Sequence, residues 1–61
     1  MQTFTSRGAA YQALRQARLD TLPVEFTTIN GQVQPTVLCV FQREVEAVRN
    51  RGFNARLHIG V

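Results

Sequence analysis

Five consecutive apolar residues, 37–41 (VLCVF), form the most hydrophobic stretch of this chain. Because they cannot all face water, they predict a strand that is buried on both faces and placed at the centre of the core. Residues 24–29 (VEFTTI) alternate and are rich in β-branched and aromatic side chains, which predicts a second strand. Asn30 and Gly31 tolerate the positive φ angles of a two-residue turn, so these strands should form a β-hairpin. Pro35 lacks a backbone donor, so we expect it at a bulge or where its strand is not yet paired on that side.

Helical patterns lie on both sides of this hairpin. Residues 7–22 are rich in Ala, Leu, Gln and Arg, and they follow Thr5 and Ser6, either of which can cap a helix. Pro23 then ends the segment, because the residue before a proline is pushed out of the helical region. Residues 42–51 show apolar positions three and four apart, with acidic residues in the first half and basic residues in the last turn. The sequence therefore predicts two helices.

The last segment, residues 53–61, alternates again and predicts a third strand, with Gly52 as the cap that ends the second helix. The resulting order is helix, hairpin, helix, strand. We expect an α+β fold in which a three-stranded antiparallel or mixed sheet is covered by one or two helices. Residues 1–61 should form a single small domain, with residues 1–5 as a flexible leader.

Composition limits how such a domain can be stabilised. A chain of 61 residues buries only about 60% of the surface that its unfolded form exposes. A single cysteine excludes an internal disulfide, and no cluster of Cys and His predicts a metal or another cofactor. A protein partner, such as further copies of this chain, is therefore the expected source of extra stability. With no signal peptide and no apolar run long enough to span a membrane, the chain is expected in the cytoplasm or in a virion.

Catalytic chemistry has little support in the sequence. Cys39 and His58 are the only residues of their kinds, and Cys39 lies inside the apolar run, where a thiol acts as a small buried hydrophobe. No two carboxylates are placed together on one face, and the glycines are scattered instead of forming a phosphate-binding loop. We expect no enzymatic activity, no catalytic residue and no small-molecule substrate.

All seven basic residues are arginines. Together with the four acidic residues they give a net charge of +3. Guanidinium groups with an interleaved aromatic ring can grip a phosphate backbone or an acidic protein surface, although an arginine-bearing helix face is usually only solvated. The candidate residues for binding nucleic acid or an acidic partner are Arg7, Tyr11, Arg15 and Arg18 on the first helix, and Arg49 and Arg51 near the end of the second.

A second set of candidates suits contacts with other proteins. The edge of the C-terminal strand would be unpaired and could take up a strand from a neighbouring chain. Phe4 and Phe53 lie at the boundaries of predicted elements, where their rings could contact a partner. The candidate residues for a protein interface are Phe4, Phe53, Arg56 and His58.

Most of the chain resembles the small head-tail joining (head-completion) proteins of tailed bacteriophages. In that family a leading helix precedes an extended segment, a turn, and a strand that ends in an aromatic residue followed by charges. The matching stretches here are AAYQALRQARLD, VEFTTINGQ, TVLCVFQREVEAV and ARLHIGV. A second group of joining proteins has the order helix, hairpin, helix, which is similar to residues 7–51.

Either resemblance implies a part of a virion that performs no catalysis, assembles into a ring, and contacts portal, tail or packaged DNA. The leading hypothesis is therefore a non-enzymatic structural domain that binds other protein subunits in a phage or prophage particle. The alternative is a small basic nucleic-acid-binding module or regulator that uses the arginine-rich helix face. An inhibitor of a host enzyme would use the same surfaces as the first hypothesis.

Overall fold

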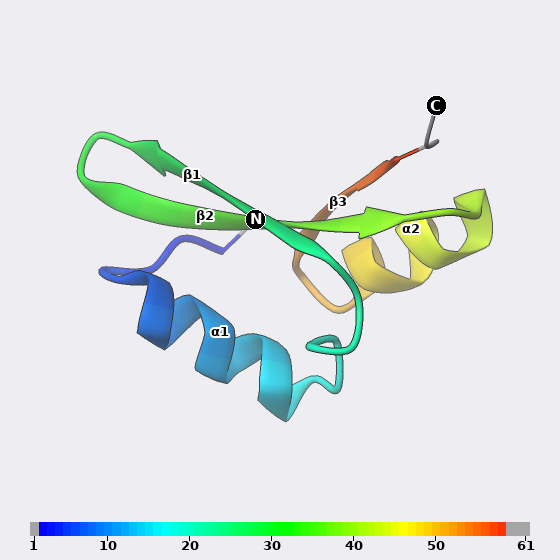
Figure 1. The fold of residues 1–61 in the computed structure, drawn as a ribbon, viewed down its shortest axis with the longest axis horizontal. Coiled ribbons are helices and arrows are strands. Elements are labelled where there is room, and N and C mark those ends of the chain that lie inside the picture. Colours follow the sequence, from blue (N-terminus) through cyan, green and yellow to red (C-terminus); the bar gives the residue numbers. More distant parts are fainter. Residues whose placement is uncertain (1, 59–61) are drawn as a thin grey trace.

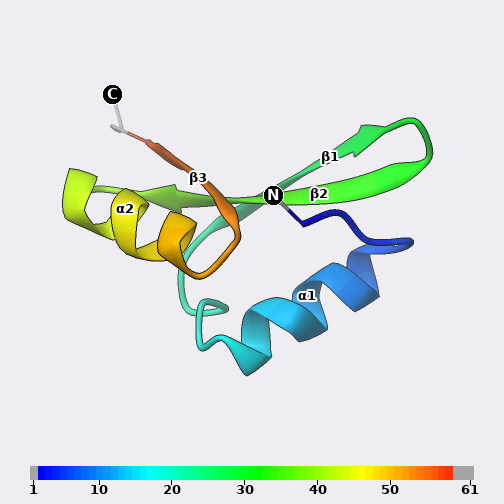
Figure 2. The same ribbon diagram turned by 180° about the vertical axis from the view of Figure 1, so that it is seen from behind.

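The computed structural model describes residues 2–58 and contains two helices and one three-stranded sheet. Along the chain, the elements are α1 (Arg7–Gln16), β1 (Val24–Ile29), β2 (Gln32–Cys39), α2 (Gln42–Asn50) and β3 (Asn54–Leu57). β2 lies between β1, to which it is antiparallel, and β3, to which it is parallel. Both helices lie on one face of the sheet (Figures 1 and 2). The expected α+β fold is confirmed, and the sheet is of the mixed kind.

The β1–β2 hairpin has the predicted two-residue turn. Ile29 pairs with Gln32, and the residues between them, Asn30 and Gly31, have φ angles of 51° and 78°. Positive φ at both central positions is what a type I′ turn requires, and its twist matches that of the flanking strands. This local signal therefore sets the register of the whole hairpin.

Pro35 lies in the middle of the central strand, and its position explains why a proline is tolerated there. On the side of β2 away from β1, the N–H and C=O of Val33 bond to the backbone of Phe4 at 2.7 and 2.8 Å, and the C=O of Cys39 accepts the N–H of His58 at 2.7 Å. Alternation points the missing donor of Pro35 to this same side. Pairing with β3 begins only at Thr36. The expectation that β2 is unpaired on that side at Pro35 is confirmed.

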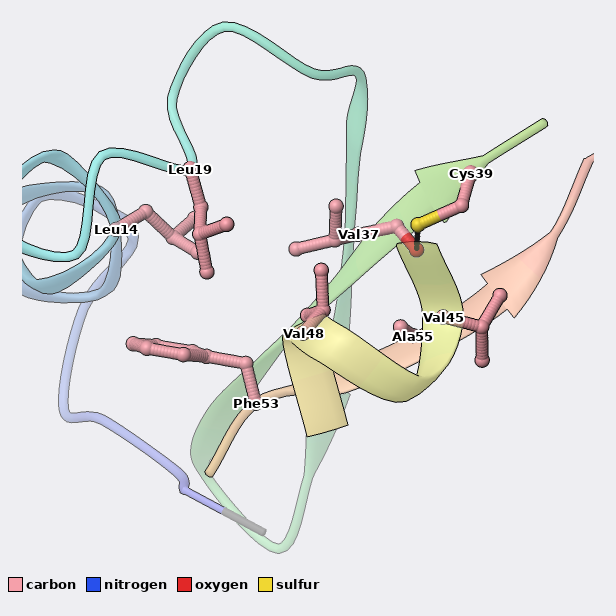
Figure 3. Close-up of a cluster of buried hydrophobic side chains, with 8 residues drawn as sticks. All are labelled: Leu14, Leu19, Val37, Cys39, Val45, Val48, Phe53 and Ala55. Atoms are coloured by element: carbon pink, nitrogen blue, oxygen red, sulfur yellow. Dashed lines mark hydrogen bonds between the residues drawn. The ribbon is translucent and has the colours of Figure 1, made fainter. Parts of the chain in front are cut away.

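The hydrophobic core lies between the sheet and the two helices (Figure 3). Each element except β1 contributes buried side chains, and the loops after α1 and after α2 add one each. Val37 in β2 is completely inaccessible to solvent. The residues of the core cluster are Leu14, Leu19, Val37, Cys39, Val45, Val48, Phe53 and Ala55. The first helix and its C-cap pack here, because Leu14 is buried and Ala13 and Ala17 pack against the cluster.

The first helix ends six residues earlier than the predicted range of 7–22. α1 begins at the predicted cap, where the Ser6 hydroxyl accepts the N–H of Ala9 at 3.1 Å, but it stops at Gln16. Arg18 has a φ of 61°, and the N–H groups of Arg18 and Leu19 donate to the carbonyls of Arg15 and Leu14. This is a Schellman motif, and it turns Leu19 into the core beside Leu14. The prediction that Pro23 ends the helix was wrong.

The second helix matches its prediction closely. Gly52 has a φ of 91°, and the N–H groups of Gly52 and Phe53 donate to the carbonyls of Arg49 and Val48, so α2 also ends in a Schellman motif. At the other end, the Glu44 carboxylate accepts the N–H groups of Val40 and Phe41, both at 3.1 Å. Glu44 thus satisfies backbone donors before α2, although Phe41 at the N-cap position has no polar side chain.

The last strand is shorter in the described residues than the predicted range of 53–61. β3 covers Asn54–Leu57, and Ala55 lies opposite Val37 in the core. The remainder of the predicted strand, residues 59–61, lies outside the described residues. Within the predicted leader, Phe4 pairs with Val33 through two backbone hydrogen bonds.

Candidate functional site

The arginine-rich face of the first helix is only partly assembled. Arg7, Tyr11 and Arg15 lie four residues apart on α1, but Arg18 lies beyond its end in the left-handed conformation. The guanidinium carbon of Arg7 lies 5.5 Å from the centre of the Phe26 ring, so this arginine rests against β1. The side chains of Arg15 and Arg18 form no hydrogen bond or ion pair with the described residues.

The second arginine cluster is occupied by contacts within the protein. Arg49 donates from Nη2 to the carbonyl of Ala55 at 2.9 Å, and Arg51 donates from Nη1 to the carbonyl of Ala17 at 2.6 Å. Ala17 is the C-cap of α1, so Arg51 satisfies a carbonyl that the helix itself leaves without a partner. These two guanidinium groups link separate backbone segments through hydrogen bonds. They are therefore less available to a phosphate than the sequence suggested.

The sheet face away from the helices is polar. Arg56 of β3 reaches across β2 to Glu25 of β1, with 3.1 Å between its Nη2 and the carboxylate, and both side chains are about half exposed. Asn54 donates from Nδ2 to the Thr36 hydroxyl at 2.8 Å. An exposed ion pair of this kind contributes roughly 0 to 1 kcal/mol. The Arg56 candidate is therefore a cross-sheet partner of Glu25.

The backbones of Cys39 and His58 are joined by a hydrogen bond, from the His58 N–H to the Cys39 carbonyl, but their side chains have different environments. Burial raises the pKa of the Cys39 thiol, and the negative charge of Glu44 raises it further. The thiol lies inside the core, 3.9 Å from the carbonyl of Val37 (Figure 3). His58 is exposed, and the residue opposite Cys39 on β3 is Leu57. A protonated, buried thiol is a weak nucleophile.

The two phenylalanine candidates have different environments. Phe53 is only 4% exposed and belongs to the core cluster, so the prediction that its ring lies on the contact surface was wrong. Its position directly after the Gly52 cap turns it inward, where it packs with Val48 in the hydrophobic contact that accompanies a Schellman motif. Phe4 is half-buried and packs against the edge of the same cluster.

The sequence did not predict the exposure of three apolar side chains at one end of the sheet. Val40 and Phe41 were expected in the buried strand, but β2 ends at Cys39 and leaves them 66% and 54% exposed. Leu57, the partner of Cys39 on β3, is 38% exposed at the same end of the sheet. The guanidinium carbon of Arg43 lies 5.0 Å from the centre of the Phe41 ring. We call Val40, Phe41 and Leu57 the apolar end patch.

Searches for sites of other kinds give negative results for residues 2–58. These residues contain no pocket and no group of three or more His, Cys, Asp or Glu that could hold a metal ion. Neither helix in this part of the chain has the length and apolar character needed to cross a membrane. Comparisons with known protein families, curated proteins and solved structures find no match to the chain.

Proposed function

We propose that this chain is a non-enzymatic domain that works by binding other protein subunits, further copies of itself among them. The observation that carries the proposal is the apolar end patch. Large apolar side chains are normal on a surface when scattered, but three gathered at one end of a sheet are typical of an interaction site. Aromatic residues and arginine, which are Phe41 and Arg43 here, are also enriched in protein interfaces.

The setting that we propose is a phage or prophage particle, in which the domain would act at the joint between head and tail. This setting rests on the sequence resemblance and places the protein in the cytoplasm during assembly or in the finished virion. A small core supports the same view, because a domain of this size gains stability when a partner covers its exposed apolar side chains.

The test is the mass in solution, measured by light scattering at several protein concentrations for the wild type and for Phe41→Ser. Serine at this N-cap position would complete a Ser-x-x-Glu capping box with Glu44, which should stabilise α2 by about 1 kcal/mol. The variant thus removes apolar surface without weakening the fold. We expect a discrete oligomer for the wild type and a smaller mass for Phe41→Ser. An unchanged mass would refute the role of the patch.

DNA binding is a second candidate because the guanidinium groups of Arg15 and Arg18 have no partner among the described residues and Tyr11 is 45% exposed. Adding a short DNA duplex to the same measurement separates the two candidates. Phosphate binding weakens steeply with salt, whereas apolar contacts do not. A monomer that forms a complex only with DNA, releases it as salt rises, and loses it on replacing Arg15 and Arg18 by Glu would overturn the protein-binding proposal.

A further inference from the structure

The outer edge of β1 presents a regular row of backbone groups. Leu38 donates its N–H to the carbonyl of Pro23 at 2.8 Å, which shows that odd-numbered residues of this segment bond to β2. In an antiparallel pair such residues alternate with residues whose N–H and C=O point the other way. Val24, Phe26 and Thr28 therefore direct their backbone groups outward, and no backbone group or side chain of residues 2–58 bonds to them there.

The two edges of the sheet differ in how they are protected. On β3, the side chain of Arg49 covers the outward carbonyl of Ala55. On β1, the pairing with β2 runs through six consecutive residues without a bulge, and the strand contains no proline or lysine. Proteins normally block an open edge with such devices because it can pair with another chain. The structure thus makes β1, instead of the predicted C-terminal strand, the better edge for strand addition.

We infer that β1 pairs antiparallel with β1 of a second copy of the chain, about a two-fold axis at Phe26. In this register Phe26 lies opposite Phe26 of the second copy, and Val24 of each copy lies opposite Thr28 of the other. All three residues with outward backbone groups then form hydrogen-bonded pairs. Two aromatic rings directly opposite on one face add a favourable cross-strand contact. The product would be a continuous six-stranded sheet.

Neighbouring registers that keep the hydrogen bonds are less favourable. Shifting the pairing toward the start of β1 places Glu25 opposite Glu25 of the other copy, and like charges directly opposite are destabilising. Shifting it toward the turn leaves Val24 without a partner within the strand. In the proposed register Glu25 lies opposite Thr27, so no charged residue of β1 meets its like. The edge is therefore complementary to itself.

The helices leave room for this pairing. α1 packs mainly against β2, not against β1. A two-fold axis through an antiparallel strand pair is perpendicular to the sheet, so both copies would carry their helices on the same face. Arg7, which lies over Phe26, approaches the axis from both copies. Because the two guanidinium groups repel one another and salt screens them, moderate salt should not weaken the dimer.

The first test follows backbone hydrogen exchange at several protein concentrations. In a dimer, the N–H groups of Phe26 and Thr28 become hydrogen-bonded and their exchange slows as concentration rises. Glu25 and Thr27 are internal controls, because their N–H groups bond to β2 in the monomer as well. Fast exchange at Phe26 and Thr28 at every concentration would overturn the inference.

The second test uses opposite charges at one position. Thr27 is exposed on the polar sheet face, so replacing it leaves the core intact. Thr27→Glu would place two pairs of like charges across the axis and should raise the dimer Kd roughly 2- to 30-fold, with part of the loss recovered in salt. In Thr27→Lys, the lysine of each copy would instead lie opposite Glu25 of the other copy. This variant should lower the dimer Kd by a similar factor. Equal effects of both variants would contradict the register.

This inference rests on the proposed protein-binding function but uses a different surface, so the two can fail separately. A dimer that Thr27→Glu dissociates and Phe41→Ser does not affect would support the β1 pairing and refute the role of the apolar end patch. An oligomer that Phe41→Ser reduces and Thr27→Glu leaves unchanged would do the reverse. A monomer under all conditions would refute both the β1 pairing and self-association through the apolar end patch.

Discussion

Arg18 is the residue whose replacement tests the fold most directly. It occupies the left-handed position of the Schellman motif that ends α1, with a φ of 61°, whereas the same position after α2 is held by Gly52. For a residue with a Cβ atom, this conformation costs about 1 to 2 kcal/mol. The Arg18 side chain is exposed and forms no hydrogen bond or ion pair with the described residues, so little is lost when it is removed.

We therefore expect Arg18→Gly to stabilise the protein. Relief of the backbone strain should outweigh the greater freedom of glycine in the unfolded chain, which costs about 0.4 to 1 kcal/mol. The net gain in the free energy of unfolding is about 0.5 to 1 kcal/mol, which corresponds to a rise in Tm of about 2 to 8 °C for a domain of this size. Urea titration followed by circular dichroism measures the change, with an unaltered m-value as the sign that both end states are preserved.

Two control variants isolate the cause. Arg18→Ala removes the same charge but keeps a Cβ atom, so its stability should stay within about 0.5 kcal/mol of the wild type. Gly52→Ala makes the opposite change at a φ of 91°, where the new Cβ would also lie 3.1 Å from Nε2 of Gln2, and it should destabilise by about 1 kcal/mol or more. If Arg18→Ala stabilises as much as Arg18→Gly, the cause is charge and the conformational argument fails.

Two further predictions concern β2 and the residue that follows it. Val37→Ala should lower the free energy of unfolding by about 2 to 3 kcal/mol because it opens a cavity at the centre of the core, whereas Val40→Ala, at an exposed site, should change it by less than about 0.5 kcal/mol. Similar losses in the free energy of unfolding of both variants, measured by urea titration, would contradict the conclusion that β2 ends before Val40. Because burial and Glu44 raise the pKa of the Cys39 thiol above its ordinary 9.0, the folded state holds this proton more tightly than the unfolded chain. The contribution of this pKa shift to the free energy of unfolding is complete below pH 9.0 and is lost as the pH rises through the folded-state pKa. Urea titrations below and above pH 9.0 should therefore show a loss of stability at alkaline pH, and this loss should be smaller in Cys39→Val.

The features of the fold that sequence predicts well are those set by neighbouring residues. Asn30 and Gly31 specify the turn through their own φ preferences, and Gly52 specifies the end of α2 in the same way. The alternation in β1 and the spacing of Val45 and Val48 in α2 reflect which side chains face the core. Each of these signals is complete within a few residues, so no knowledge of the tertiary structure is needed to interpret it.

The errors arise where the packing of distant segments decides the local conformation. Nothing about Arg18 favours a left-handed residue, and the apolar Leu19 and Leu22 continue the helical pattern. α1 ends at Gln16 because Leu19 gains more by entering the core than by extending the helix. In the same way, the run at residues 37–41 does not reveal that the sheet ends after Cys39, and so the exposure of Val40 and Phe41 was missed.

The candidate sites were harder to predict than the fold. Residue type identified the arginines as groups that can bind an anion, but their partners are backbone carbonyls that are distant in sequence. Arg51 donates to Ala17, which lies 34 residues away, and only the packing of the two helix ends brings them together. The open edge of β1 likewise became apparent only from the strand order and from the contact that covers part of β3.

β2 is the middle strand of the sheet and also lies near the middle of the chain, and this coincidence governs how fast the domain can form. The turn to β1 is two residues long, and the β2–β3 pair closes over a separation of 18 residues between Thr36 and Asn54. Closing loops this short costs less chain entropy than closing longer ones, by about 0.6 kcal/mol for each halving of length. Folding should therefore be fast, so the chain should reach its native state before a partner arrives. Binding would then lengthen the lifetime of the folded form more than it speeds its formation.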